Sequence, residues 1–231
     1  MSINHNTLGQ EIGSPLPQWQ ACPKPAKQPI VGTFCCLEPL NISRHGEQLW
    51  QAFRADTEDR IWTYLPYGPF TTSGELQHWL SNVCPSEDPL FFAIIDTSNG
   101  KALGIASYLR IQPAAGVIEV GNINFSPALQ KTTAATEAMY LMMKHAFQLG
   151  YRRYEWKCDN LNLGSKKAAQ RLGFSFDGLF KQATVYKSRN RDTAWFSLLD
   201  ADWPATEAAY QRWLSPDNFT PDGAQRSALS T

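Results

Sequence analysis

The sequence predicts a mixed α/β (α+β) fold with a central, mostly antiparallel sheet and helices on both faces. Apolar runs at Leu90–Asp96 and Ala102–Arg110 flank Asn99-Gly100, a dipeptide that favours a tight hairpin turn. Further along, a strand, a long helix and another strand follow one another, an order that indicates parallel pairing of the two strands. A sheet with one parallel pair among antiparallel neighbours is therefore expected.

The first third of the chain predicts an arm, one strand and two helices. Residues 1–29 contain prolines that exclude a long helix or central strand, and Trp19 is expected to hold this arm against the domain surface. A strand is expected at Val31–Leu37 and helices at Ser43–Ala55 and Ser73–Val83. Between the helices lies a stiff aromatic loop, 62–70.

The rest of the chain predicts the second half of the same domain. A strand at Val117–Phe125 leads into a long helix from Thr133, the expected N-cap, to Gly150. The expected elements that follow are a strand at Tyr151–Cys158, a helix at Ser165–Leu172, strands at Phe174–Phe180 and Thr193–Leu199, and a helix at Pro204–Leu214. We expect one domain over 30–214 and a polar, loosely held tail over 215–231.

Composition excludes several classes of function. The chain has 231 residues with 21 basic and 21 acidic side chains, so no global field favours nucleic acid or an acidic membrane. No apolar run is long enough to span a bilayer. The five cysteines form no C-x-x-C pair and no zinc-like spacing, so we expect reduced thiols, no metal and a cytoplasmic location.

The start of the long helix has the features of an anion site. Pro127 and the hydroxyls of Thr132 and Thr133 mark the turn into the helix, and Ala134 and Ala135 keep its backbone accessible. Free N–H groups and the positive end of the helix dipole attract phosphate. Such residues also occur at ordinary strand-to-helix connections.

The order of residues here resembles a motif of the GNAT N-acetyltransferase superfamily. Phe125-x-Pro127-x-x-Gln130-x-x-Thr133-x-Ala135 is similar to that family's V-x-P-x-x-[Q/R]-x-x-G-x-[G/A]. The resemblance covers about 30–200 and implies the GNAT fold with acetyl-CoA as donor. It implies that Phe125 contacts the pantetheine, and that the diphosphate is held by Gln130, Lys131, Thr132, Thr133, Ala134 and Ala135. Thr133 departs from the family's glycine.

A second stretch resembles the ribosomal-protein-alanine branch of these acetyltransferases. It consists of Asn162-x-x-Ser165 followed by Leu172-Gly173-Phe174. The resemblance implies that Asn162 holds the pantetheine arm and that Ser165 donates a proton or hydrogen bond to the departing thiolate. Many members have a tyrosine where this chain has Ala169. Asparagine and serine before a helix are also ordinary caps.

Glu119 is the candidate general base. It lies in mid-strand between Ile118 and Val120, an unusual place for a carboxylate unless it faces a cleft. The alternative is a salt bridge or an exposed strand face. By strict alternation Asn122 and Asn124 face the side opposite Glu119, unless a bulge changes that parity.

The acceptor side is expected at the aromatic loop. Trp62, Tyr64 and Tyr67 supply contact area with polar tips, and Asn122 is a candidate for orienting the acceptor. The alternative is a loop that only packs on the surface. The lysines 166 and 167 could meet the 3′-phosphate of coenzyme A or be simply solvated.

Together these features predict an N-acetyltransferase that moves an acetyl group from acetyl-CoA to a primary amine by direct attack, without metal. A module that binds coenzyme A or a partner without turnover is the alternative, as is a transferase of a longer acyl group such as succinyl. The expected partner is an amine acceptor, either a small molecule or a protein N-terminus. Neither nucleic acid nor membrane is expected, and the protein is expected to be a monomer or homodimer.

Overall fold

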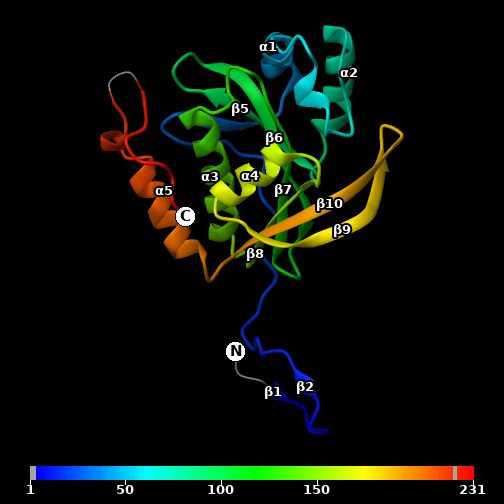
Figure 1. The fold of residues 1–231 in the computed structure, drawn as a ribbon, viewed down its shortest axis with the longest axis vertical. Coiled ribbons are helices and arrows are strands. Elements are labelled where there is room, and N and C mark those ends of the chain that lie inside the picture. The colour runs from blue at the N-terminus through cyan, green and yellow to red at the C-terminus, as the bar shows by residue number, and fades with distance from the viewer. Residues whose placement is uncertain (1–3, 221–222) are drawn as a thin grey trace.

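The computed structural model describes residues 4–220 and 223–231, in which one large sheet forms the centre of the molecule (Figure 1). Its eight strands run in the order β3-β4-β5-β6-β7-β8-β10-β9. Within the described residues only β7 and β8 pair in parallel. The strand bounds are β3 Ile30–Val31, β4 Cys35–Pro39, β5 Leu90–Asp96, β6 Lys101–Gln112, β7 Val117–Phe125, β8 Arg153–Asp159, β9 Ser175–Tyr186 and β10 Arg189–Leu199.

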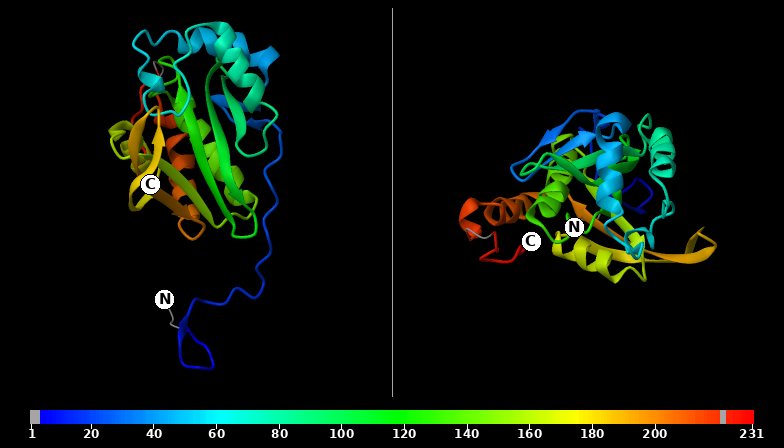
Figure 2. Two further views of the ribbon diagram at one scale, coloured as in Figure 1. Left: turned by 90° about the vertical axis from the view of Figure 1, so that its right-hand side faces the viewer. Right: turned by 90° about the horizontal axis from the view of Figure 1, so that it is seen from above.

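Helices cover both faces of this sheet, as the views in Figures 1 and 2 show. The helix α1 contacts β6 and α2 on one face, whereas α3, α4 and α5 lie on the other. Their bounds are α1 Ile42–Phe53, α2 Ser73–Val83, α3 Thr133–Gln148, α4 Leu163–Arg171 and α5 Trp203–Trp213, with short 3₁₀ turns η1 Arg60–Trp62 and η2 Pro216–Asn218. The predicted fold class is therefore confirmed.

The helix α3 is more deeply buried than its apolar stripe predicts. Residues 134–143 are all buried, because the sheet covers one side and α5 the other. Tyr140 stacks on Tyr210 of α5 with ring centroids 5.0 Å apart. The hydroxyl of Tyr108 on β6 donates to the Met142 carbonyl at 2.6 Å. These contacts fix where the first turn of α3 lies relative to β7.

The single strand expected at Val31–Leu37 is wrong, because the chain turns back on itself there. β3 and β4 form an antiparallel pair joined at Gly32, Thr33 and Phe34. The carboxylate of Glu137 on α3 accepts the backbone N–H groups of Thr33, Phe34 and Cys35 at 2.6–2.8 Å. A Cβ on Gly32 would come within 2.6 Å of this carboxylate, so the turn requires glycine.

Along β7 strict alternation ends at Gly121, because the bulge named above as the alternative is present. Asn122 has φ of 50° and the pairing with β6 shifts there, since Ser107 pairs with Gly121 but Ile105 with Asn124. This bulge moves Asn124 to the face that Ile105 shares with α1 and α2, which is the face of Glu119.

Both ends of the chain lie against the domain in part. The arm forms a small hairpin, β1 Asn4–His5 with β2 Glu11–Ile12, that stands away from the sheet in Figures 1 and 2. Trp19 holds the arm as expected, because its Nε1 donates to the Ala114 carbonyl at 2.9 Å. The tail is not loosely held, since Leu229 joins the main core and Asn218 is buried. The domain bounds 30–214 stay a prediction.

Candidate active site

The parallel strands β7 and β8 separate toward their carboxyl ends. Their last paired residues are Val120 and Trp156, although β7 continues to Phe125 and β8 to Asp159. Beyond Trp156 the strand β8 pairs only with β10. The backbone of β7 past Val120 therefore lacks a neighbour on the β8 side, and α3 and α4 begin just after the two separated ends.

The start of α3 presents backbone donors at this opening. The N-cap is Thr132 and not Thr133, because the Thr132 hydroxyl accepts the Ala135 N–H at 3.1 Å. The N–H groups of Lys131, Thr133 and Ala134 have no acceptor among the residues that the structure describes. Three unpaired donors at the positive end of a helix dipole are suited to a phosphate group.

The left-handed residue of this loop is Lys131, with φ of 62°, whereas Thr133 has no positive φ. The threonine that replaces the family's glycine therefore fits without backbone strain. The Gln130 side chain donates to the Phe125 carbonyl at 3.0 Å and closes the loop.

Arg171 is a functional candidate that the sequence analysis missed. Its guanidinium lies 3.3 Å from the Thr136 hydroxyl in the first turn of α3 and 5.5 Å from the centre of the Trp213 ring. This places a positive charge at the first turn of α3. A basic residue near the end of α4 gave no sign in the sequence that it would reach α3.

Hydrogen bonds at the start of α4 hold Asn162 and Ser165, the residues expected near the sulfur of coenzyme A. Asn162 caps the helix by accepting the Ser165 N–H at 3.0 Å, and the Ser165 hydroxyl accepts the indole N–H of Trp156 at 2.9 Å. The same hydroxyl also hydrogen-bonds the Cys158 sulfur, so its hydrogen must leave that partner before it can donate to another sulfur. Burial raises the pKa of the neighbouring Cys158 thiol, partly offset by its hydrogen bond with Ser165.

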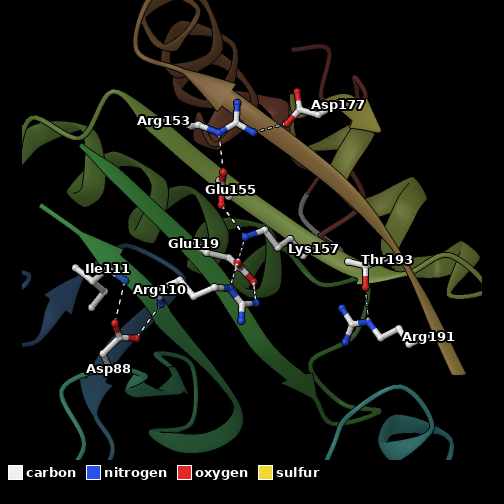
Figure 3. Close-up of polar contacts among 10 residues, drawn as sticks. All are labelled: Asp88, Arg110, Ile111, Glu119, Arg153, Glu155, Lys157, Asp177, Arg191 and Thr193. Carbon is white, nitrogen blue, oxygen red and sulfur yellow. Dashed lines mark hydrogen bonds and ion pairs between the residues drawn. The ribbon is translucent and has the colours of Figure 1, made fainter. Parts of the chain in front are cut away.

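The salt-bridge alternative for Glu119 is confirmed. The side chain is 2% exposed, and its oxygens lie 2.6 Å from two nitrogens of Arg110 and 2.9 Å from Lys157 Nζ. Figure 3 shows that this row of charges continues through Glu155 and Arg153. Each oxygen of Glu119 is already engaged by a cation in this arrangement, and the role of general base stays a prediction.

The aromatic loop closes over the open ends of the strands. The hydroxyl of Tyr64 donates to the Leu161 carbonyl at 3.2 Å, which joins the loop to the segment between β8 and α4. From the β9–β10 hairpin, Lys187 donates to the Trp62 carbonyl at 2.8 Å and Arg189 to the Thr63 carbonyl at 2.7 Å. The loop therefore contacts both the segment after β8 and the β9–β10 hairpin, on either side of the opening.

The side chains expected to contact the acceptor differ in burial and in their hydrogen-bond partners. The Trp62 ring is buried beneath the loop and packs edge-on against Phe53, and the Tyr67 hydroxyl is buried without a partner among the described residues. Burial raises the pKa of Tyr67 well above its ordinary value. Asn122 donates to the Ser107 hydroxyl at 2.9 Å.

Two further expectations concern metals and membranes. Over residues 4–220 and 223–231, no group of histidine, cysteine or carboxylate side chains could hold a metal ion. In the same residues, none of the helices has the length and apolar character needed to cross a bilayer.

Lys166, a candidate for the 3′-phosphate of coenzyme A, donates from its Nζ to Asn160 Oδ1 at 2.8 Å.

The sheet separates between two parallel strands, the first N–H groups of α3 lack acceptors, and Ser165 begins α4 nearby. These features together are those of an acyl-CoA-dependent transferase. The sequence model of the acetyltransferase (GNAT) domain matches residues 35–175. The chain belongs to the GNAT acetyltransferase family, whose members use acetyl-CoA.

Solved structures agree with this assignment. A GCN5-related N-acetyltransferase from Brucella melitensis is 47% identical, with a TM-score of 0.91 over 93% of this chain and 97% of that chain. A probable GNAT acetyltransferase from Chromobacterium violaceum is 42% identical, with a TM-score of 0.78 over 84% of this chain and 96% of that one.

The resemblance to the ribosomal-protein branch is confirmed as a distant structural one. The ribosomal L7/L12 alpha-N-protein acetyltransferase RimL is 20% identical, with a TM-score of 0.64 over 74% of this chain and 93% of that one, and it shares the fold. No curated protein matches the chain.

Proposed function

We propose that the protein transfers the acetyl group of acetyl-CoA to a primary amine by direct attack. The amine nitrogen bonds to the thioester carbon, the carbon–sulfur bond breaks, the amine loses a proton and the thiolate gains one. The observation that carries the proposal is the start of α3, where the amides of Lys131, Thr133 and Ala134 have no acceptor among the described residues, in the segment that follows the separated strand β7. Such an array of donors suits a diphosphate.

We propose the following roles for the donor side. The loop 130–135 holds the diphosphate, with Arg171 adding charge, while Phe125 and Asn162 contact the pantetheine arm. Ser165, in the first turn of α4 and beside Trp156 of β8, donates its hydroxyl hydrogen to the departing sulfur. On the acceptor side, Tyr64 and Asn122 are the side chains with polar atoms, and Trp62 and Tyr67 shape the wall.

The state of Glu119 favours an acceptor amine of low pKa. A lysine-like amine, with a pKa of about 10.4, is neutral in roughly one molecule per thousand at pH 7.4, so deprotonation costs about 4 kcal/mol. An α-amine, with a pKa of about 8, costs well under 1 kcal/mol. Because both oxygens of Glu119 are occupied, the protein has the easier task with an α-amine.

Calorimetry with acetyl-CoA, followed by thiol release with a panel of amines, tests the proposal. We expect micromolar-range binding and amine-dependent release of coenzyme A. Binding without release would leave a binding module, and succinyl-CoA in parallel tests for a longer acyl group. Absence of heat at millimolar acetyl-CoA would refute the proposal.

Two broader properties belong to the same proposal. All five cysteines are unpaired, which suits a reducing compartment, and we propose a cytoplasmic enzyme. We propose that it acts as a monomer or homodimer on a small amine or a protein N-terminus, without nucleic acid or membrane.

A further inference from the structure

Arg191 lies at the opening, on the side opposite β7. Arg191 comes just before Asp192 and Thr193 in β10. Thr193 pairs with Asp159, the last residue of β8. Asp159, Lys157 and Glu155 alternate along β8, and Glu155 pairs with Glu119. Arg191 and Thr193 therefore belong to the face of Glu119, and Figure 3 shows both in one view with that carboxylate.

The guanidinium of Arg191 is held in place but has no acidic partner. Its Nε donates to the Thr193 hydroxyl at 3.1 Å, and it lies 5.9 Å from the centre of the Tyr186 ring. Asp159 is already engaged, because it accepts the Tyr186 hydroxyl at 2.8 Å and the Leu161 N–H at 2.9 Å. Within the described part of the chain no carboxylate forms an ion pair with half-buried Arg191.

The tip of the surrounding hairpin carries several basic side chains, with Asp192 directly after them bound to Gln182 and Asn190. Residues 181–191 contain Lys181, Lys187, Arg189 and Arg191 and no acidic residue. Lys187 and Arg189 donate to backbone carbonyls of the aromatic loop, not to carboxylates. Burial, and then the charge of Arg189, lowers the pKa of Lys187. Clustered cations at a surface attract molecules of the opposite sign.

The other side of the opening supplies a polar group without charge. Asn124 lies on β7, is 2% exposed, and neither its amide nitrogen nor its oxygen has a partner among the described residues. A buried amide without partners is costly, and natural proteins satisfy nearly all such groups. The bulge at Asn122 places it on the same face as Arg191.

We infer that the acceptor amine carries an anionic group, a carboxylate or a phosphate, which Arg191 binds while the amine lies toward β7. The planar fork of a guanidinium matches both anions with two parallel hydrogen bonds. This inference rests on the proposed function and narrows its acceptor class.

Matched acceptors test the inference by turnover. Each α-amino acid is compared with its α-amide, and phosphoethanolamine with ethanolamine, and rates are taken per concentration of neutral amine because the anion also raises the pKa of the amine beside it. The anionic member should have the higher kcat/KM, and the pair with the larger ratio tells whether a carboxylate or a phosphate is bound. Equal rates, or a preference for the neutral members, would overturn the inference while leaving the proposed function intact.

Variants of the hairpin supply the control. Arg191→Gln should raise KM for the anionic acceptor about 10- to 100-fold, the usual worth of a hydrogen bond to a charged group. It should leave the affinity for acetyl-CoA within about twofold. Arg212→Gln, outside the hairpin, removes the same charge from an exposed position of α5 and should change KM little. Arg191→Lys keeps the charge and should recover part of the loss.

Two outcomes separate the inference from its premise. Weaker binding of acetyl-CoA by Arg191→Gln, with unchanged acceptor KM, would mean that Arg191 meets a phosphate of the donor, and would overturn the inference. If no amine releases coenzyme A, the proposed function fails. Calorimetry of an amino acid and its amide on protein saturated with coenzyme A then decides: heat from the amino acid alone supports the inference, and any other result overturns it.

Discussion

The guanidinium of Arg110 makes two hydrogen bonds to the carboxylate of Glu119, both at 2.6 Å. Arg110 is 52% exposed at its side chain, whereas Glu119 is 2% exposed. Lys157, 7% exposed, joins the same carboxylate from β8. Glu119 on β7 thus holds two cations, one from each neighbouring strand.

Glu119→Gln should therefore destabilise the protein and slow every acceptor alike. Removing the charge leaves buried Lys157 short of a partner, which costs roughly 2–4 kcal/mol of unfolding free energy. Urea unfolding and acceptor kinetics measure the two effects. A much larger loss of rate with a lysine-like amine than with an α-amine would instead identify Glu119 as the general base.

Thr132→Ala and Thr133→Ala form a matched pair at the start of α3. Only the Thr132 hydroxyl caps the helix, so its removal should lower the unfolding free energy by about 1 kcal/mol. Thr133→Ala should have little effect. Denaturant titration of both variants compares them, and equal losses would contradict the assignment of Thr132 as the cap.

Ser165→Ala should lower kcat while leaving the affinity for acetyl-CoA nearly unchanged. Loss of a proton donor to a leaving group reduces rates by a factor on the order of 10². The variant also leaves the Trp156 indole without its acceptor, so thermal melting is needed beside kinetics. Cys158→Ala alters the neighbouring thiol and serves as control. Unchanged kcat in Ser165→Ala would remove the serine from the mechanism.

Glu137→Gln should be among the more damaging single changes outside the site. The carboxylate accepts three backbone N–H groups at the β3–β4 turn, and an amide can replace only part of that acceptance. We expect a loss of about 2–4 kcal/mol, measured by chemical unfolding. Glu207→Gln, which breaks a 3.6 Å surface pair with Lys144, should cost under about 1 kcal/mol.

Acid should destabilise the protein through two histidines. Burial lowers the pKa of His45 and of His145 below the 6.5 of the unfolded chain. The unfolded chain therefore binds more protons as pH falls, so this stability is present above about pH 6.5 and is lost below it. The slope is at most about 1.4 kcal/mol per pH unit for each histidine.

Unfolding at several pH values between about 5.5 and 7.5 measures this effect. The double variant His45→Gln/His145→Gln should flatten the dependence in that window. Carboxylates with lowered pKa, such as Glu155, titrate at more acid pH and do not interfere. An unchanged slope in the double variant would show that other groups cause the loss.

Elements with strong local signals could be predicted from the sequence. Asn99-Gly100 placed the β5–β6 hairpin, and the strand–helix–strand order placed the parallel pair of β7 and β8. The capping asparagine of α4 and the loop before α3 were found through residue order. In these cases the residues that determine the structure are neighbours in the chain.

What sequence reasoning missed depends on contacts between distant residues. The break between β3 and β4 is held by Glu137, and the bulge at Asn122 shows only in its pairing with β6. The state of Glu119 depends on Arg110 and Lys157 from two other strands. Arg171 reaches the start of α3 only because α4 folds beside it. No periodic pattern in a single segment carries such information.

The link between Glu137 and the β3–β4 turn also has a consequence for biosynthesis. Phe34 leaves the ribosome long before Glu137, since 103 positions separate them. Until the later residue is translated, three turn amides have no acceptor from α3, and the first two sheet strands lack their clamp. A nascent chain truncated before α3 should thus expose this turn to proteases, while a chain extended past α3 protects it.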